Sequence, residues 1–205
     1  RSTHRMSSAA SDVYKRQGSG SEHLPSGHVR IYKNVNNTWK QIGEDIDGEV
    51  INGGLGTSVS LSSDGSVIAI GAPYNDRNGN DSGHVRIYKN VNDTWTQVGS
   101  DVDGEAAADY SGETVSLSSD GSVIAIGAMG NDGNGTDSGH VRIYKNLDNI
   151  WTQVGEDIDG ESNGDSSGSS VSLSSDGSIV AIGAQLNSEN GIVSGHVRIY
   201  KNVNN

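Results

Sequence analysis

The sequence predicts an all-β fold built from a tandem repeat, and two observations support this. A nine-residue stretch, Ser-Gly-His-Val-Arg-Ile-Tyr-Lys-Asn, begins at Ser26 and returns unchanged at Ser82, Ser138 and Ser194, so the period is 56 residues. Within each period, short segments of alternating apolar and polar residues are bounded by Gly, Asn, Asp and Ser, which is the pattern of strands and turns. A period of this length is typical of stacked or circular arrays of small sheets.

Each repeat contains four candidate strands. In the copy that begins at Gly56 the expected strands are 58–62, Val67–Ala72, Gly83–Lys89 and Trp95–Val102. Both faces of Val67–Ala72 are apolar, so this strand is expected to be buried on both sides, and its Ala and Gly suggest that neighbouring sheets approach closely. Asp64-Gly65, between the first two strands, predicts a hairpin with a type I′ turn.

Four short antiparallel strands per unit, repeated in tandem, predict the blades of a partial β-propeller, about three of them in an open arc. A β-solenoid and a string of separate sandwiches are the alternatives; solenoid coils are usually shorter, and sandwiches need about seven strands each. The expected divisions are a non-repeat tail at 1–25, outer strands of a first blade at 26–54, blades at 55–110 and 111–166, and an incomplete blade at 167–205.

The residues Leu55-Gly56, Ser58-Val59, Val67–Pro73 and Gly83–Tyr88 together resemble the FG-GAP repeat of integrin α-subunit propellers, which bacterial secreted proteins also carry. The resemblance implies a propeller at the cell surface or outside the cell that serves interaction or adhesion. The sequence departs from the family first in its motif residues. The Phe of the Phe-Gly pair is replaced by Leu55, Ser111 and Ser167, and the Pro of Gly-Ala-Pro is kept at Pro73 but replaced by Met129 and Gln185.

The second departure concerns the family's calcium-binding loop between the first two strands, which here is shortened to Ser-Ser-Asp-Gly-Ser. The family's calcium site therefore does not carry over to Asp64, Asp120 or Asp176, which are expected to be turn residues. The run 12–17, Asp-Val-Tyr-Lys-Arg-Gln, resembles a translated sequencing adapter, and the fourth copy stops before its Trp. We therefore expect a fragment, cut at both ends, whose open blades self-associate.

The composition excludes several functions. The formal net charge is −12, which argues against nucleic acid because phosphate binding needs clustered Lys and Arg. No apolar run approaches the roughly 18 residues that a membrane span needs, so we expect no membrane insertion. The absence of Cys excludes disulfides and thiolate metal sites.

Most of the 26 acidic residues fall in the loops that follow the second and fourth strands, and the only base there is Arg77. Antiparallel topology places these loops on one face. Calcium prefers carboxylate, amide and main-chain oxygens, so the loops hold candidate calcium ligands: Asp76, Asn78 and Asp81, then Asp132, Asn134 and Asp137. The run Asp-x-Asp-Gly-Glu at 45–49, 101–105 and 157–161 is a second option, and a solvated acidic surface is the alternative to both.

No catalytic set stands out, so the sequence favours a non-catalytic interaction module that binds a protein or glycan at the acidic loop face. The alternatives are the propeller portion of a carbohydrate-active enzyme and a calcium-stabilised repeat with no ligand of its own. His28, His84, His140 and His196 could suggest a metal ring, but they belong to different blades and a structural role is favoured. Trp39, Trp95 and Trp151 are expected to anchor the outer strands, and a sugar-binding row is the alternative.

Overall fold

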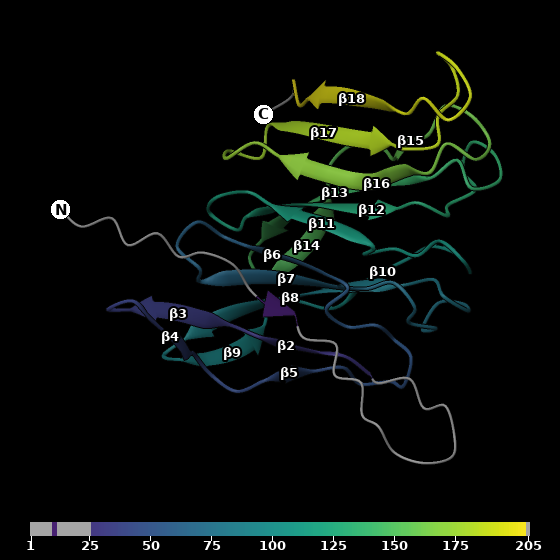
Figure 1. Ribbon diagram of the computed structural model, residues 1–205. Helices are drawn as coiled ribbons and strands as arrows, with labels where there is room; N and C mark the ends of the chain where they lie inside the picture. Colours follow the sequence, from purple (N-terminus) through teal and green to yellow (C-terminus); the bar gives the residue numbers. More distant parts are fainter. Residues whose placement is uncertain (1–9, 12–25, 204–205) are drawn as a thin grey trace.

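Figure 1 shows the computed structural model as a series of small antiparallel sheets stacked along the chain. The structure describes residues 10–11 and 26–203, and every regular element within them is a β-strand. The described chain has no helix of the length and apolarity that crossing a membrane requires. The adapter-like run 12–17 and most of the expected tail lie outside the described residues. The all-β prediction is confirmed: successive sheets form a partial β-propeller that does not close.

The blade in the middle of the chain shows the common pattern. Its strands are β6 (Ser58–Leu61), β7 (Val67–Ala72), β8 (His84–Val91), β9 (Thr94–Gln97) and β10 (Val102–Asp103). They pair antiparallel in the order β6-β7-β8, and both β9 and β10 pair with β8. The prediction of one continuous fourth strand over Trp95–Val102 was wrong, because Gly99 takes a left-handed φ of 74° and breaks the strand in two.

The neighbouring sheets repeat this pattern. The next blade contains β11 (Thr114–Leu117), β12 (Val123–Ala128), β13 (His140–Leu147), β14 (Ile150–Gln153) and β15 (Ile158–Asp159). The last sheet contains β16 (Ser167–Leu173), β17 (Ile179–Ala184) and β18 (His196–Lys201). Ahead of them lie β1 (Ala10–Ser11), β2 (His28–Arg30), β3 (Tyr32–Val35), β4 (Thr38–Gln41) and β5 (Ile46–Asp47). β1 and β5 pair with β2, and β3 pairs with β4.

The core lies between the sheets. Ala69, on one face of β7, belongs to a buried cluster that also contains Ile124 and Ile126 of the next blade. Ile68 and Ile70, on the other face, pack with the residues of β2 and its neighbours. β7 is therefore buried on both sides, as its composition predicts. Serine hydroxyls link the inner strands: Leu117 N donates to Ser60 Oγ at 2.9 Å, and the contact recurs 56 residues later.

The turn at Asp64-Gly65 differs from the predicted type I′, but Asp64 is a turn residue as predicted. At Asp64-Gly65 only Gly65 has a positive φ, so the turn is not type I′. Asp64 Oδ1 accepts bonds from Ser62 Oγ at 2.7 Å and from Ser66 N at 2.9 Å, which fixes the Asx-type turn expected of this residue. The two-residue turn with both φ angles positive lies instead between β8 and β9, at Asn92 and Asp93.

The close approach of neighbouring sheets predicts a specific loss of stability. A Cβ added to Gly71 in β7 would lie 1.9 Å from the carbonyl oxygen of Gly112 in the next blade. Gly71→Ala is therefore expected to destabilise the chain by about 2–3 kcal/mol, a fall in Tm of roughly 5–10 °C in thermal melting. At Gly183, the same position of the last sheet, a Cβ would meet only the rotatable Ser170 hydroxyl within 3.5 Å. Equal losses for Gly71→Ala and Gly183→Ala would contradict the explanation.

The last sheet exposes apolar positions that the other blades bury. Val85 and Ile87 of β8 have no exposed surface, whereas Val197 and Ile199 of β18 are 66% and 72% exposed. Because the same residues pack against a blade wherever one follows, we expect this face to bind a second copy of the chain. Val197→Thr with Ile199→Thr should shift light scattering towards monomer. Association that is unchanged in this variant would exclude β18 as the contact.

Candidate functional site

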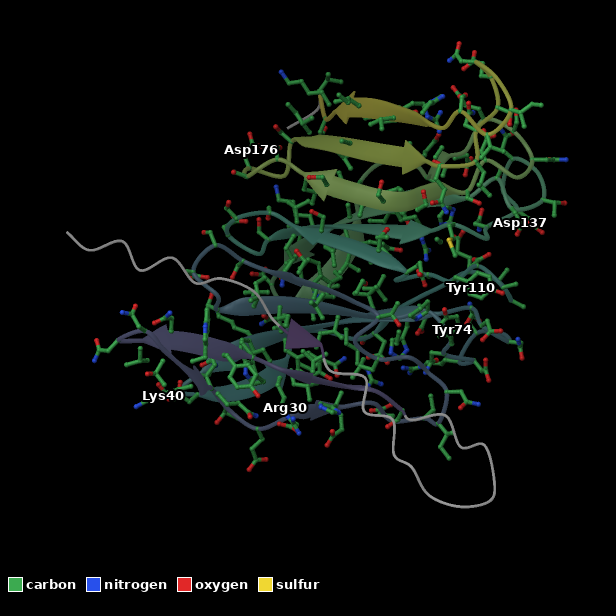
Figure 2. All side chains as sticks on the ribbon, viewed as in Figure 1. Arg30, Lys40, Tyr74, Tyr110, Asp137 and Asp176 are labelled. Atoms are coloured by element: carbon green, nitrogen blue, oxygen red, sulfur yellow. The ribbon has the colours of Figure 1, made fainter. Side chains whose placement is uncertain are left out.

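The loops after β7 and β10 lie together on one face of the arc. In Figure 2, Tyr74, Tyr110 and Asp137 lie on this side, and Asp176 lies on the opposite side. We call segments 49–54, 73–83, 104–113, 129–139, 160–166 and 185–195 the loop face. Asn80 O accepts a bond from Ala108 N at 2.8 Å, and Asp81 O accepts one from Tyr110 N at 3.1 Å. Equivalent bonds hold the next pair of loops, so the face is fixed by main-chain contacts.

The candidate calcium ligands shape these loops. Asp76 Oδ1 accepts the main-chain N–H of Asp81 at 2.8 Å, and Asn78 Nδ2 donates to Gly104 O at 2.8 Å. Asp132, Asn134 and Asp137 repeat both contacts in the next blade. These hydrogen bonds account for the loop conformation from protein groups alone. Calcium binding at these residues stays a prediction.

The Asp-x-Asp-Gly-Glu runs join consecutive blades through ion pairs. Arg86 in β8 bonds Asp101 of its own blade at 3.0 Å and Glu49 of the preceding loop. The two later Arg residues contact the Glu of the preceding loop in the same way: Arg142 with Glu105 at 3.3 Å and Arg198 with Glu161 at 3.4 Å. In the first two of these interfaces a guanidinium is buried, with side-chain exposures of 5% for Arg86 and 7% for Arg142.

The histidines lie beside these ion pairs and not in a ring. The described residues that come close enough to share a metal form three groups, each with one histidine: His84 with Asp101 and Asp103, His140 with Glu105 and Asp157, and His196 with Glu161 and Glu189. His84 and His140 are buried, and burial lowers the pKa of both imidazoles. The predicted blade-interface position is therefore correct for both. The ring that a shared metal would need is not formed by the described histidines.

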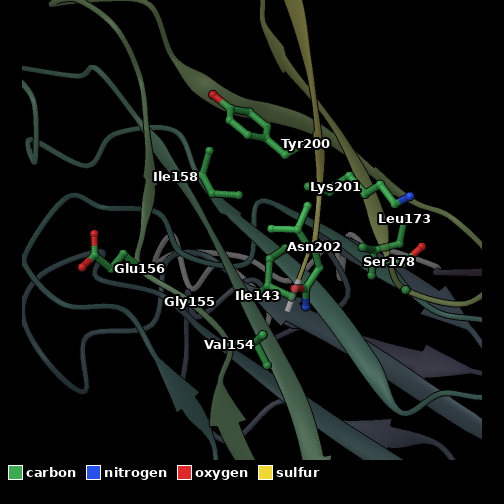
Figure 3. Close-up of a pocket in the computed structure, with 13 residues that line it drawn as sticks. Ile143, Val154, Gly155, Glu156, Ile158, Leu173, Ser178, Tyr200, Lys201 and Asn202 are labelled. Carbon is green, nitrogen blue, oxygen red and sulfur yellow. The ribbon is translucent and has the colours of Figure 1, made fainter. Parts of the chain in front are cut away.

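The tryptophans join the outer strands. Trp95 Nε1 donates to Ile42 O of the preceding blade at 3.0 Å, and Trp151 Nε1 donates to Val98 O at 2.9 Å. Both rings are partly buried against the core, so these two do not form an exposed row for sugars. A pocket with a volume of about 350 Å³ is lined by Val154 and Tyr200, among others, and Figure 3 shows these two side chains on either side of it. One repeat earlier, the Trp151 ring occupies the equivalent place beside Val98 and Gly99.

A tyrosine pair on the loop face was missed from the sequence. The rings of Tyr74 and Tyr110 meet edge to face, with centroids 6.0 Å apart and an interplanar angle of 74°. Tyr74 is 43% exposed. Beside them, burial raises the pKa of Glu113, whose buried Oε2 has no hydrogen-bond partner. A comparison of the repeats could have identified Tyr110, because the equivalent residues of the other copies are Gly54 and Ser166.

The backbone at Tyr110 is strained. Its φ is 54°, in the left-handed region, where Gly54 and Ser166 also lie at 68° and 51°. A bulky residue rarely adopts this conformation, which costs roughly 1–2 kcal/mol. The neighbouring copies make room for the rings, since a Cβ on Gly54 would meet Tyr74 and one on Gly130 would meet Tyr110. The ring at this position is therefore held at a cost in backbone energy.

Comparison with known proteins supports the fold. Residues 52–88 match the family model described as FG-GAP repeat, which confirms the resemblance. No curated protein is significantly similar. One similar solved structure is a complex of KlAtg21 with the coiled-coil of AgAtg16, at 15% identity and a TM-score of 0.55 over 87% of this chain and 48% of that one.

Another is a putative 6-phosphogluconolactonase from Bacteroides uniformis, at 16% identity and a TM-score of 0.52 over 86% of this chain and 53% of that one. The chain thus spans about half the length of these structures, and the likeness concerns the fold alone. The chain carries a β-propeller-type module with FG-GAP repeat character, a kind of module common in interaction and adhesion proteins.

The buried ion pair at Arg86 predicts how stability depends on pH. Burial raises the pKa of Asp101, but hydrogen bonds from Arg86 and Gln97 outweigh it and hold that pKa below the ordinary 3.8. The pair therefore stabilises the fold above about pH 4, and this stability is lost as the pH falls through the lowered pKa. Arg77 still pairs with Asp101 in an Arg86→Met variant, so this substitution should cost about 1.5–3 kcal/mol at pH 7 and flatten the acid limb of the Tm–pH curve.

The last blade offers a matched control for this variant. Arg198 is more exposed, at 20%, and its partner Glu161 is 42% exposed. Arg198→Met should therefore cost only about 1 kcal/mol. If the Tm of Arg86→Met still falls steeply at low pH, groups other than this ion pair cause the loss of stability in acid.

Proposed function

We propose that this chain is a non-catalytic interaction module from a secreted or cell-surface protein, and that its loop face binds a protein ligand. The observation that carries the proposal is the Tyr74–Tyr110 pair, set among carboxylates on a face whose backbone is fixed. Tyrosine is enriched among the residues that dominate binding energy, because its large rigid ring buries much area at little entropic cost.

The chemistry of the loop face indicates the kind of partner. Exposed apolar side chains also lie on the loop face, namely Val50, Ile51, Leu186, Ile192 and Val193. Protein interfaces usually combine apolar contacts with polar and charged residues at the rim. The acidic residues around it, in a chain with a net charge of −12, favour a partner segment rich in Lys or Arg through electrostatic complementarity.

The alternatives differ in what they require of the loop face. A glycan would stack a sugar ring on Tyr74 and would bind with little dependence on salt. The propeller portion of a carbohydrate-active enzyme would need an acid–base pair, and the propeller fold of the similar lactonase does not supply one by analogy. A calcium-stabilised repeat without a ligand would bind neither probe. The extracellular or cell-surface location rests on the FG-GAP resemblance.

The test uses fluorescent peptides of Lys, Arg and Gly, compared with their acetylated, uncharged counterparts and with an oligosaccharide panel. The basic peptides are expected to bind, and to weaken as salt rises. Tyr110→Gly restores the residue found at Gly54. It relieves about 1 kcal/mol of strain and adds a similar entropic cost. Loss of the ring contact with Tyr74 costs about 0.5–1.5 kcal/mol more, so the Tm should fall by only about 2–5 °C. Peptide affinity should fall about tenfold or more.

Charge on the opposite face provides the control. Asp93→Asn with Asp148→Asn removes two acids from the β8–β9 and β13–β14 turns, where Asn tolerates the left-handed φ. This variant should bind the peptides as the parent does. If the chain binds the oligosaccharides and not the peptides, its ligand is a glycan and not a protein. If Tyr110→Gly binds the basic peptides as tightly as the parent does, the loop face is not the binding surface.

A further inference from the structure

A histidine and three carboxylates gather at the interface after β10. His140 begins β13, Asp157 and Asp159 lie at the β15 end of the same blade, and Glu105 reaches in from the preceding loop. His140 Nδ1 lies 3.7 Å from Asp157 Oδ2 and 4.0 Å from Asp159 Oδ1. Ligand atoms of Glu105, His140 and Asp157 all lie within 4.8 Å of one another. Two carboxylates thus converge on one imidazole nitrogen.

The imidazole of His140 makes no hydrogen bond that would account for its burial. The residue is 1% exposed, and its Nε2 is buried without a partner. A buried polar group is normally hydrogen-bonded, because leaving it unpaired costs free energy. The unpaired Nε2 lies on the opposite edge of the ring from the carboxylates, and Nδ1 is the atom that faces them. The distances from Nδ1 to Asp157 and Asp159 exceed hydrogen-bond length. A third species bonded to both Nδ1 and the carboxylate oxygens is compatible with these distances.

The preceding interface shows what normally neutralises these carboxylates. There the Arg77 guanidinium bonds Asp101 at 2.7 Å and lies 3.8 Å from Asp103, and Arg86 bonds Asp101 as well. One repeat later, Gly133 stands in place of Arg77. The loop backbone is the same, since Gly133 N donates to Asn131 Oδ1 at 2.8 Å as Arg77 N donates to Asn75 Oδ1 at 2.9 Å.

Arg142, the counterpart of Arg86, does not supply the missing charge. Its guanidinium contacts Glu105 and donates to Asp103 O at 2.8 Å, both on the preceding blade's side. Asp157 instead accepts a bond from the neutral amide of Gln153 at 2.6 Å. The interface with Gly133 thus has the same carboxylates and histidine as the preceding interface with Arg77, but less positive charge.

We propose that this cluster, which we call the His140 site, binds a divalent transition-series cation such as Zn²⁺ through His140, Asp157 and Glu105, with Asp159 near the same nitrogen as a fourth ligand. Zinc bonds to His nitrogen and carboxylate oxygen are about 2.0–2.2 Å long. Two ligands on one ion are then roughly 3.0–4.2 Å apart, depending on the angle. The distances of 3.7 and 4.0 Å fall in this range.

The donor set selects the class of metal. Imidazole suits zinc and its neighbours, whereas calcium takes oxygen ligands only. The interface after β15 is less suitable, because Glu161 faces Nε2 of His196 at 3.5 Å and Glu189 faces Nδ1 at 3.8 Å. These nitrogens lie on different edges of the ring, so the two carboxylates do not converge on one of them. The His140 site bridges two blades, so an ion there would tie them together.

The test measures Zn²⁺ binding by titration calorimetry and Co²⁺ binding by visible absorption on the full chain, with His4→Gln and His23→Gln in every form to remove the two histidines outside the repeats. One ion per chain is expected, with a rise in Tm on adding Zn²⁺ and no competition from Ca²⁺. Asp157→Asn should weaken binding by at least roughly 100-fold, since even the loss of an outer-shell partner costs 10- to 100-fold. His140→Gln should do the same.

The ligand variants replace buried or partly buried residues and could unfold the chain, so two further variants test the proposal without removing a ligand. Gly133→Arg copies the first interface and should abolish Zn²⁺ binding without removing a ligand, while circular dichroism stays unchanged. His84→Gln, at the interface that already holds Arg77, should leave Zn²⁺ binding as it is. The proposal is overturned if no Zn²⁺ or Co²⁺ binds, if Ca²⁺ competes on equal terms, or if Gly133→Arg or Asp157→Asn binds Zn²⁺ as the parent does.

Discussion

Close packing of sheet against sheet is the constraint on which the rest of this structure depends. A blade of four short strands is too thin to enclose a core of its own, so each face must be covered by a neighbour. The central strand β7 meets this requirement with Ile68 and Ile70 on one side and Ala69 on the other, all fully buried. Gly71 then brings its backbone against Gly112 of the next blade. Small residues on these strands are thus a condition of stacking, and the strand hardly varies between copies.

The same stacking forces charge into the interfaces. β8 presents Val85 and Ile87 to the next blade, so alternation turns His84 and Arg86 towards the preceding one, where both are buried. Burying a guanidinium is unfavourable unless it is paired, and the gain from pairing rarely exceeds the desolvation cost by much. The ion pairs of Arg86, Arg142 and Arg198 with the preceding Glu therefore connect consecutive blades but add little net stability.

Much of the fold could be predicted from the sequence, because period, alternation and turn residues are local signals. The core strand of each repeat is an example. The type of the Asp64 turn was not predictable in this way, since it depends on the bonds from Asp64 to Ser62 and Ser66, which compete with a type I′ turn. The break in the fourth strand likewise reflects β8, which pairs with β9 and β10 at different registers.

The candidate sites were less predictable, because they arise between repeats and not within one. Residues 21–37 positions apart meet across each interface: Asp109 with Gly130, Glu49 with Arg86. A scan for motifs inside one loop pointed to Asp76, Asn78 and Asp81, whose contacts maintain the loop. It did not bring Glu105 beside His140, since that contact requires the blade geometry. The Asp-x-Asp-Gly-Glu runs were recognised as candidate ligands, but their Arg partners were not.

Within a near-identical repeat, an informative residue is one that departs from its copies while the backbone stays the same. Tyr110 shares its left-handed φ with Gly54 and Ser166, so a requirement for stability alone would favour glycine there. Gly133 makes the same loop hydrogen bond as Arg77, so the loop conformation does not depend on the guanidinium. In both places the packing constraint is satisfied by every copy and cannot explain the difference. A physical role outside folding is then the more economical account, for a ring in one case and for a cation in the other.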